Sequence, residues 1–174
     1  MGGMGMLRRA TLAGALLSWA GLIAACSGDI SSASSVAAAD WVTSGFTGVQ
    51  RGLQVTQSAV VIYQGGDPAQ GLAQLHVGRQ LISNGLGSME SGLGMTDPSG
   101  AVAQCRDAIL APLQAMQTGL EELNAALALL DAGGDAAQGL THVQSGAAIV
   151  DRGQADMEGA LMGCGLMAMG DGGM

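Results

Sequence analysis

A cysteine follows the first apolar stretch of this chain, at a position where a thiol could be modified. Arg8 and Arg9 precede the stretch, which runs from Ala10 to Ala25, and Cys26 comes directly after it. A positive start, a short apolar stretch and small residues before a cleavage point are the three zones of a secretory signal peptide. The stretch is shorter than a membrane-spanning helix requires. Residues 1–25 are therefore predicted to be a signal peptide.

The end of this stretch, Ile23-Ala24-Ala25-Cys26, resembles the lipobox of bacterial lipoproteins, in which an aliphatic residue and two small residues precede a cysteine. The resemblance implies that the Cys26 thiol carries a diacylglyceryl group, and that cleavage before Cys26 frees an amine for acylation by a chain such as palmitate. Two or three fatty chains make a lasting anchor, at about 0.8 kcal/mol per buried CH₂. Ser27 is not Asp, which favours the outer membrane over inner-membrane retention. The alternative is an ordinary signal peptide whose cysteine stands there by chance.

Cys105 and Cys164 remain as an even pair on the exported side, where disulfides persist. A Gly-Gly-Asp turn at 133–135 is expected to fold two helices back on each other. Cys105 lies 29 residues before Gly134 and Cys164 lies 30 residues after it, so an antiparallel hairpin brings them to nearly the same height. We predict a disulfide between Cys105 and Cys164, with free thiols or metal ligands as the alternatives.

Residues suited to metal binding or catalysis are few. His76 and His142 are expected on different helices at different heights, so each is better explained as an exposed or half-buried histidine than as a ligand. Neither has a glutamate three residues before it, which a di-metal bundle site needs. The sequence contains no haem-attachment, nucleophile-elbow, phosphate-loop or zinc-spacing motif. We expect no catalytic residues, no metal, no cofactor and no enzymatic activity.

Methionine gives an alternative to this expectation. Thioether groups suit Cu(I), and four methionines surround Cys164 near the end of the chain: Met162, Met167, Met169 and Met174. A Cys164 in a disulfide could not bind copper. The first residues of the chain are also rich in Gly and Met, so the methionines near Cys164 are better explained by general composition than by metal binding. The remaining prominent methionines are expected to fill the core: Met89, Met116 and Met157.

The charge of the chain limits its partners. Its 174 residues carry a formal charge of −8, and after removal of the signal fourteen acids face only four arginines, which gives −10. This acidity argues against nucleic-acid binding, because a phosphate-binding surface needs clustered positive charge. Binding to anionic lipid through charge is excluded, so membrane attachment is expected through the lipid alone.

Glycine and proline divide the remaining chain into four segments that are expected to be helices, over residues 36–63, 68–95, 98–131 and 136–165. The last three follow an aspartate placed as a helix N-cap, namely Asp67, Asp97 and Asp135.

Residues 65–93 align without gaps to residues 133–161, which indicates two copies of one helical hairpin. The predicted fold is therefore all-α, an antiparallel up-down four-helix bundle over residues 36–166 built from two similar hairpins. A tether over 26–35 precedes it, and a flexible Gly/Met tail over 167–174 follows it.

Each segment shows an apolar column with alternating steps of three and four residues, as in helices that pack along a seam. A second column of mostly small residues lies beside it at seven-residue spacing: Gly45, Gly52, Ala59, Gly71, Gly78, Gly85, Gly92, Cys105, Pro112, Gly119, Ala126, Gly139, Gly146, Gly153 and Ala160. Because glycine inside a helix costs about 0.8–1 kcal/mol relative to alanine, this register predicts close approach of helix backbones. General glycine richness is the alternative. Pro112 is expected to kink the third helix.

Arg79 and Gln154 interrupt the apolar columns and are expected in one layer of the seam, near Asp151 and Asp156. A buried polar layer of this kind fixes register and partner choice. The alternative is that Arg79 extends its side chain to the surface.

These observations predict a lipid-anchored lipoprotein of the bacterial cell envelope with a non-enzymatic structural or protein-binding role. Its expected partners are the membrane, through the lipid, and an envelope protein or a second copy. Its expected location is the outer membrane, facing the periplasm or the cell surface. The alternative is a periplasmic protein that binds copper or a small ligand through the Met/Cys-rich C-terminus or the bundle core.

Overall fold

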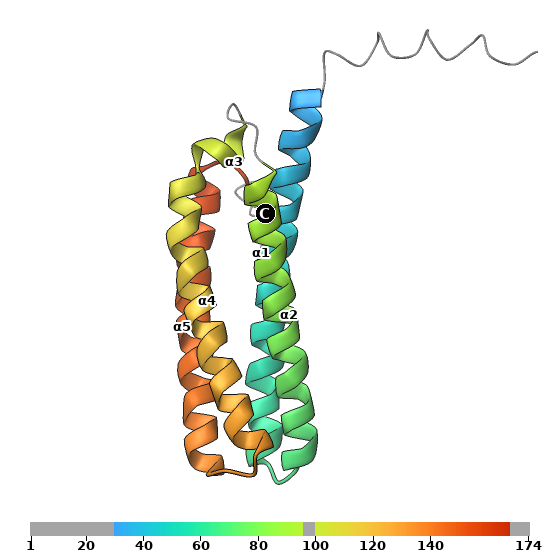
Figure 1. Cartoon of the computed structure of the whole chain (residues 1–174), viewed down its shortest axis with the longest axis vertical. Helices are drawn as coiled ribbons and strands as arrows, with labels where there is room; N and C mark the ends of the chain where they lie inside the picture. Colours follow the sequence, from blue (N-terminus) through green and yellow to red (C-terminus); the bar gives the residue numbers. More distant parts are fainter. Residues whose placement is uncertain (1–29, 96–99, 168–174) are drawn as a thin grey trace, which may run out of the picture. The chain divides into compact units, whose positions relative to one another are not determined.

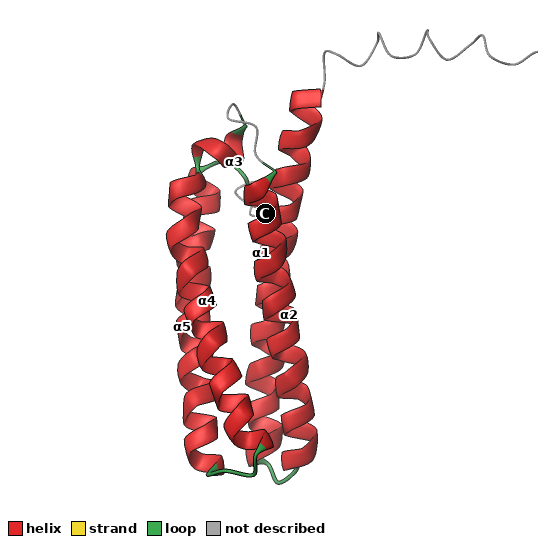
Figure 2. Cartoon of the chain, viewed as in Figure 1, coloured by secondary structure: helices red, strands yellow, loops and turns green. Residues whose placement is uncertain are grey.

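The computed structural model describes residues 30–95 and 100–167. Contacts divide the chain into two units, Met1–Ile30 and Ser31–Met174. The predictions for the signal peptide, for Cys26, for the Asp97 helix cap and for tail residues 168–174 fall outside the described residues. Every regular element in the described ranges is a helix (Figure 2), which confirms the all-α prediction.

The helices are α1 (Ile30–Gln64), α2 (Pro68–Gly94), α3 (Ala101–Gln104), α4 (Arg106–Asp131) and α5 (Ala136–Gly163). They form two packed pairs, α1 with α2 and α4 with α5, and α2 also packs against α4 (Figure 1). A short turn joins the two helices of each pair. None of the helices described has both the length and the apolar content to cross a membrane.

Aspartate caps begin α2 and α5, as the sequence predicts. The Asp67 carboxylate accepts a hydrogen bond from the backbone N–H of Gln70 at 2.9 Å. The Asp135 carboxylate accepts two, from Ala137 at 2.8 Å and from Gln138 at 3.1 Å. These bonds satisfy amides that have no partner within the helix.

Replacing Asp135 by alanine is expected to lower the free energy of unfolding by about 1 kcal/mol, because two amides of the first turn lose their acceptor. Urea denaturation measures the change. Asp156→Ala is the matched control, since Asp156 lies exposed within the same helix and makes no side-chain hydrogen bond to any described residue. Equal losses in both variants would contradict the cap's contribution.

Two predicted boundaries are wrong. Helix α1 begins at Ile30, so the second half of the predicted tether over 26–35 is helical. The expected helix over 98–131 is interrupted at Cys105, which ends α3 and precedes α4. Val102 and Ile109 lie on either side of Cys105, and both are buried. Because they keep the seven-residue spacing of a continuous helix, the apolar periodicity does not indicate the interruption.

Pro112 does not interrupt the third segment. It is buried within α4, which continues as α-helix on both sides of it. The kink expected at Pro112 therefore stays a prediction, and the break in the helix of this segment lies seven residues earlier, at Cys105.

The apolar columns form the core, as predicted. Met89, Met116 and Met157 are fully buried, which confirms their expected role as core residues. Most other column members are also buried: Val42, Phe46, Val49, Leu53, Leu75, Ile82, Leu86, Leu93, Val102, Ile109, Leu113, Leu123, Leu127, Leu130, Leu140, Val143, Val150 and Leu161. Arg106 lies between Val102 and Ile109 at the spacing of the third segment's apolar column, but it is exposed.

The small residues lie where the helices of each pair meet. A Cβ atom added to Gly85 would lie 2.6 Å from the carbonyl oxygen of Gly45, and one added to Gly146 would lie 2.8 Å from that of Gly119. Real Cβ atoms essentially never come so close to another atom. The glycine columns therefore allow close backbone contact within both pairs, which confirms the packing interpretation over general glycine richness.

Candidate functional site

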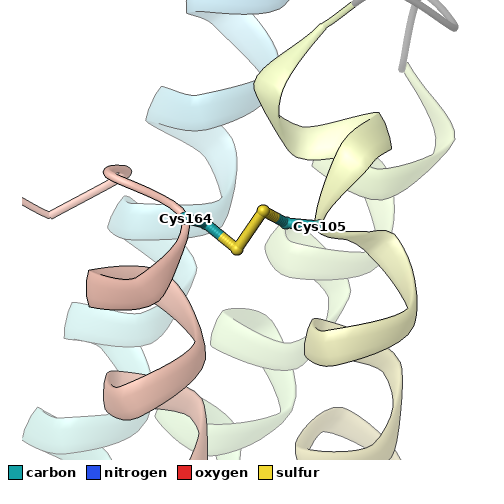
Figure 3. Close-up of a disulfide and its surroundings, with 2 residues drawn as sticks. All are labelled: Cys105 and Cys164. Atoms are coloured by element: carbon teal, nitrogen blue, oxygen red, sulfur yellow. A yellow bond between two sulfur atoms is a disulfide. The ribbon is translucent and has the colours of Figure 1, made fainter.

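The two described cysteines join the open end of the α4–α5 pair (Figure 3). Their Sγ atoms lie 2.11 Å apart and their Cα atoms 6.0 Å apart, across a sequence separation of 59 residues. Cys105 stands at the junction of α3 and α4, and Cys164 follows α5 directly. The predicted pairing is present, and neither sulfur is a free thiolate that could bind a metal.

Each histidine is half-buried and pairs with one carboxylate on α4. Nε2 of His76 lies 3.0 Å from Oδ1 of Asp131, and Nδ1 of His142 lies 2.5 Å from Oε1 of Glu122. Among residues 30–95 and 100–167, no three or more histidine, cysteine, aspartate or glutamate residues gather as a metal site would require. With Cys164 in a disulfide, the copper alternative loses the thiolate that the Met-rich end was expected to supply.

Arg79 and Gln154 do not form the predicted polar layer. Arg79 lies between α2 and α4, where its guanidinium donates to Oδ1 of Asn124 at 3.2 Å and to Oε1 of Gln80 at 3.1 Å. Gln154 lines a hollow between α1 and α5. Both residues stand at the edge of the apolar face, where a long side chain can reach water. Thr56 is the one polar side chain fully buried in the described part of the chain.

A groove lies between α1 and α5 on the described surface. It consists of one hollow of about 320 Å³ and a second of about 240 Å³, which share Gln57 and Asp151. We call the two together the α1–α5 groove. Its lining residues are Gln50, Leu53, Gln54, Thr56, Gln57, Val60, Gln144, Ala147, Ala148, Asp151 and Gln154.

The α1–α5 groove is suited to recognition through hydrogen bonds. The side chains of its five glutamines and of Asp151 form no hydrogen bond with any other described residue. They therefore offer amide donors, amide acceptors and one carboxylate beside apolar residues such as Val60 and Ala147. Residue periodicity does not predict this groove, although the aligned repeats contain a signal for it, since Ala147 occupies the place of Arg79.

Comparison with known protein families, with characterised proteins and with solved structures finds no match to this chain.

Proposed function

We propose that this chain is a lipid-anchored lipoprotein of the bacterial cell envelope with a non-enzymatic, protein-binding role. The sequence from Ile23 to Cys26 carries the proposal, because it combines the lipobox residues with the position at which a signal peptide ends. The disulfide between Cys105 and Cys164 supports export, since such bonds persist outside the cytoplasm. Helix α1 begins four residues after Cys26, so the folded body would follow the lipid closely.

The proposed body is an antiparallel up-down four-helix bundle made of two similar hairpins. Three observations support this arrangement: the two packed pairs, the packing of α2 on α4, and the groove that α1 and α5 line together. In this arrangement each helix has two neighbours, and the buried apolar columns face a common core. In such a body the surface side chains are carried by regular helices. Helices hold side chains in fixed positions, which suits a binding surface that is already formed before the partner binds.

The proposed location is the outer membrane, facing the periplasm or the cell surface, because Ser27 stands where an inner-membrane retention signal would have Asp. The lipid provides the membrane attachment, since a mature charge of −10 is repelled by anionic headgroups. The same charge favours a basic protein partner.

Labelling of the full chain with radioactive palmitate in a bacterial host tests the anchor. Wild type is expected to incorporate label, and the mass of its N-terminal peptide is expected to show lipid on Cys26. Cys26→Ser is expected to lose all label, while the control Cys105→Ser/Cys164→Ser, which removes the other two cysteines, is expected to keep it. An unlabelled wild type with a free Cys26 thiol would remove the anchor from the proposal.

A further inference from the structure

The internal repeat relates the two lines of contact between the hairpins. Residues of α2 correspond to residues of α5 that lie 68 positions later, as the aligned turn and helix start show. The buried column of α1 corresponds to that of α4 at 67 positions, with Val42 matching Ile109 and Val49 matching Met116. The α2–α4 seam is therefore equivalent to the α5–α1 seam.

Four positions of the α1–α5 groove have an equivalent that lines the hollow between α2 and α4. The equivalent pairs are His76 and Gln144, Arg79 and Ala147, Asn124 and Gln57, and Leu127 and Val60. The two seams thus have equivalent helix positions but different side chains at these four positions.

The largest of these differences is the exchange of Arg79 for Ala147. In the α2–α4 seam the Arg79 side chain is half-buried, its guanidinium bonds Asn124, and the hollow measures about 230 Å³. In the α1–α5 seam Ala147 contributes only a methyl group and the main hollow measures about 320 Å³. Gln57 stands where Asn124 stands, so an amide oxygen is retained as an acceptor.

We propose that the α1–α5 groove binds an arginine side chain from a basic segment of a partner protein. The Asp151 carboxylate and the amide oxygens of Gln57 and Gln144 can accept hydrogen bonds from a guanidinium, and Val60 offers an apolar surface to its aliphatic stem. Arginine fits this set better than lysine because its planar head presents five donors in fixed directions. The inference rests on the protein-binding role proposed above and names the chemistry of the partner.

Charge complementarity supports this occupant. Asp151 lines both hollows of the groove and forms no ion pair with any described residue. The mature chain carries −10 overall, so a basic segment is attracted to it from a distance. An arginine of the partner would thus occupy the α1–α5 groove as Arg79 of this chain occupies the equivalent hollow between α2 and α4.

NMR titration of the lipidated full chain in detergent micelles tests this assignment. The probe is the tripeptide acetyl-Gly-Arg-Gly-amide, and the matched probes replace its arginine by lysine or by uncharged citrulline. We expect saturable shifts of the Gln57 and Gln144 side-chain amides with the arginine probe, roughly threefold weaker binding of the lysine probe and roughly tenfold weaker binding of the citrulline probe.

Matched variants make the test specific. Ala147→Arg supplies the side chain from the chain itself and is expected to abolish the shifts, whereas Ala155→Arg adds the same charge at an exposed position of α5 outside the groove and is expected to keep them. Asp151→Asn is expected to weaken binding at least roughly fivefold, and Asp156→Asn, also exposed and outside the groove, is expected to leave it unchanged.

Three results would overturn the inference: equal binding by Ala147→Arg and wild type, equal binding of the arginine and citrulline probes, or no shifts at all. Concentration-dependent association of the chain that protects the groove would also overturn it, by making a second copy the occupant. Lipidation is measured separately. A chain with lipid on Cys26 that ignores the arginine probe therefore contradicts this inference alone, and an unmodified chain that binds the probe contradicts the anchor alone.

Discussion

Replacing Gly85 by alanine is expected to lower the free energy of unfolding by about 2 kcal/mol and the Tm by about 6–8 °C. The new Cβ would lie 2.6 Å from the carbonyl oxygen of Gly45 and 2.8 Å from the backbone nitrogen of Val49. Neither backbone atom can rotate away as a flexible side chain could, so α1 and α2 must separate. Overpacking of this kind costs up to about 3 kcal/mol, and the better helix propensity of alanine offsets about 1 kcal/mol of it.

Gly87→Ala is the matched control for this prediction. Gly87 is exposed two residues further along α2, and a Cβ added there meets nothing within 4 Å. Alanine at this position is expected to raise the free energy of unfolding by about 1 kcal/mol, through helix propensity alone. Urea denaturation should therefore separate the two alanine variants by about 3 kcal/mol. If both substitutions stabilise the protein, α1 and α2 are not in close backbone contact.

The packing within each helix pair could be predicted from the sequence because the same contact recurs along the helices. A small residue is required every two helical turns, and this produces a column of small residues at seven-residue spacing that general composition does not explain. The apolar columns are readable for the same reason, since burial acts on every turn of each helix. The aspartate caps of α2 and α5 are local signals and could also be predicted.

Features decided by a single residue could not be predicted in this way. The interruption at Cys105 leaves Val102 and Ile109 in register, so no apolar position moves. Periodicity assigns Arg79 and Gln154 to apolar columns. It does not predict whether such a long side chain points into the core or extends along the edge of the column to the surface.

The α1–α5 groove also escaped prediction, because it depends on a difference between the two aligned segments, residues 65–93 and 133–161. The repeat is recognised by the positions at which the two segments have the same residue, such as the turns at Gly65 and Gly133. The groove instead lies where the two segments differ, at the position occupied by Arg79 in one and by Ala147 in the other. A comparison of the two seams position by position needs the contacts of α2 with α4, which the structure supplies.

Removing the disulfide with Cys105→Ser/Cys164→Ser is expected to lower the free energy of unfolding by about 2–4 kcal/mol. The bond closes a loop across a separation of 59 residues, and most of its effect is to restrict the unfolded chain. Reduced wild type is the matched control, since it lacks the same bond but keeps both sulfur atoms. Urea denaturation should place the serine variant and reduced wild type within about 0.5 kcal/mol of each other, both below the oxidised protein.

The position of the bond adds an expectation that loop entropy alone does not give. The disulfide joins the α3–α4 junction to the end of α5, where Leu166 and Met167 pack against the core. The opposite end of the same pair is closed by the Gly133–Asp135 turn and by the Asp135 cap. Hydrogen exchange should therefore accelerate more in residues 101–110 and 160–167 than in residues 125–140 when the bond is removed. Uniform acceleration along α4 and α5 would instead mean that the bond acts only on the unfolded chain.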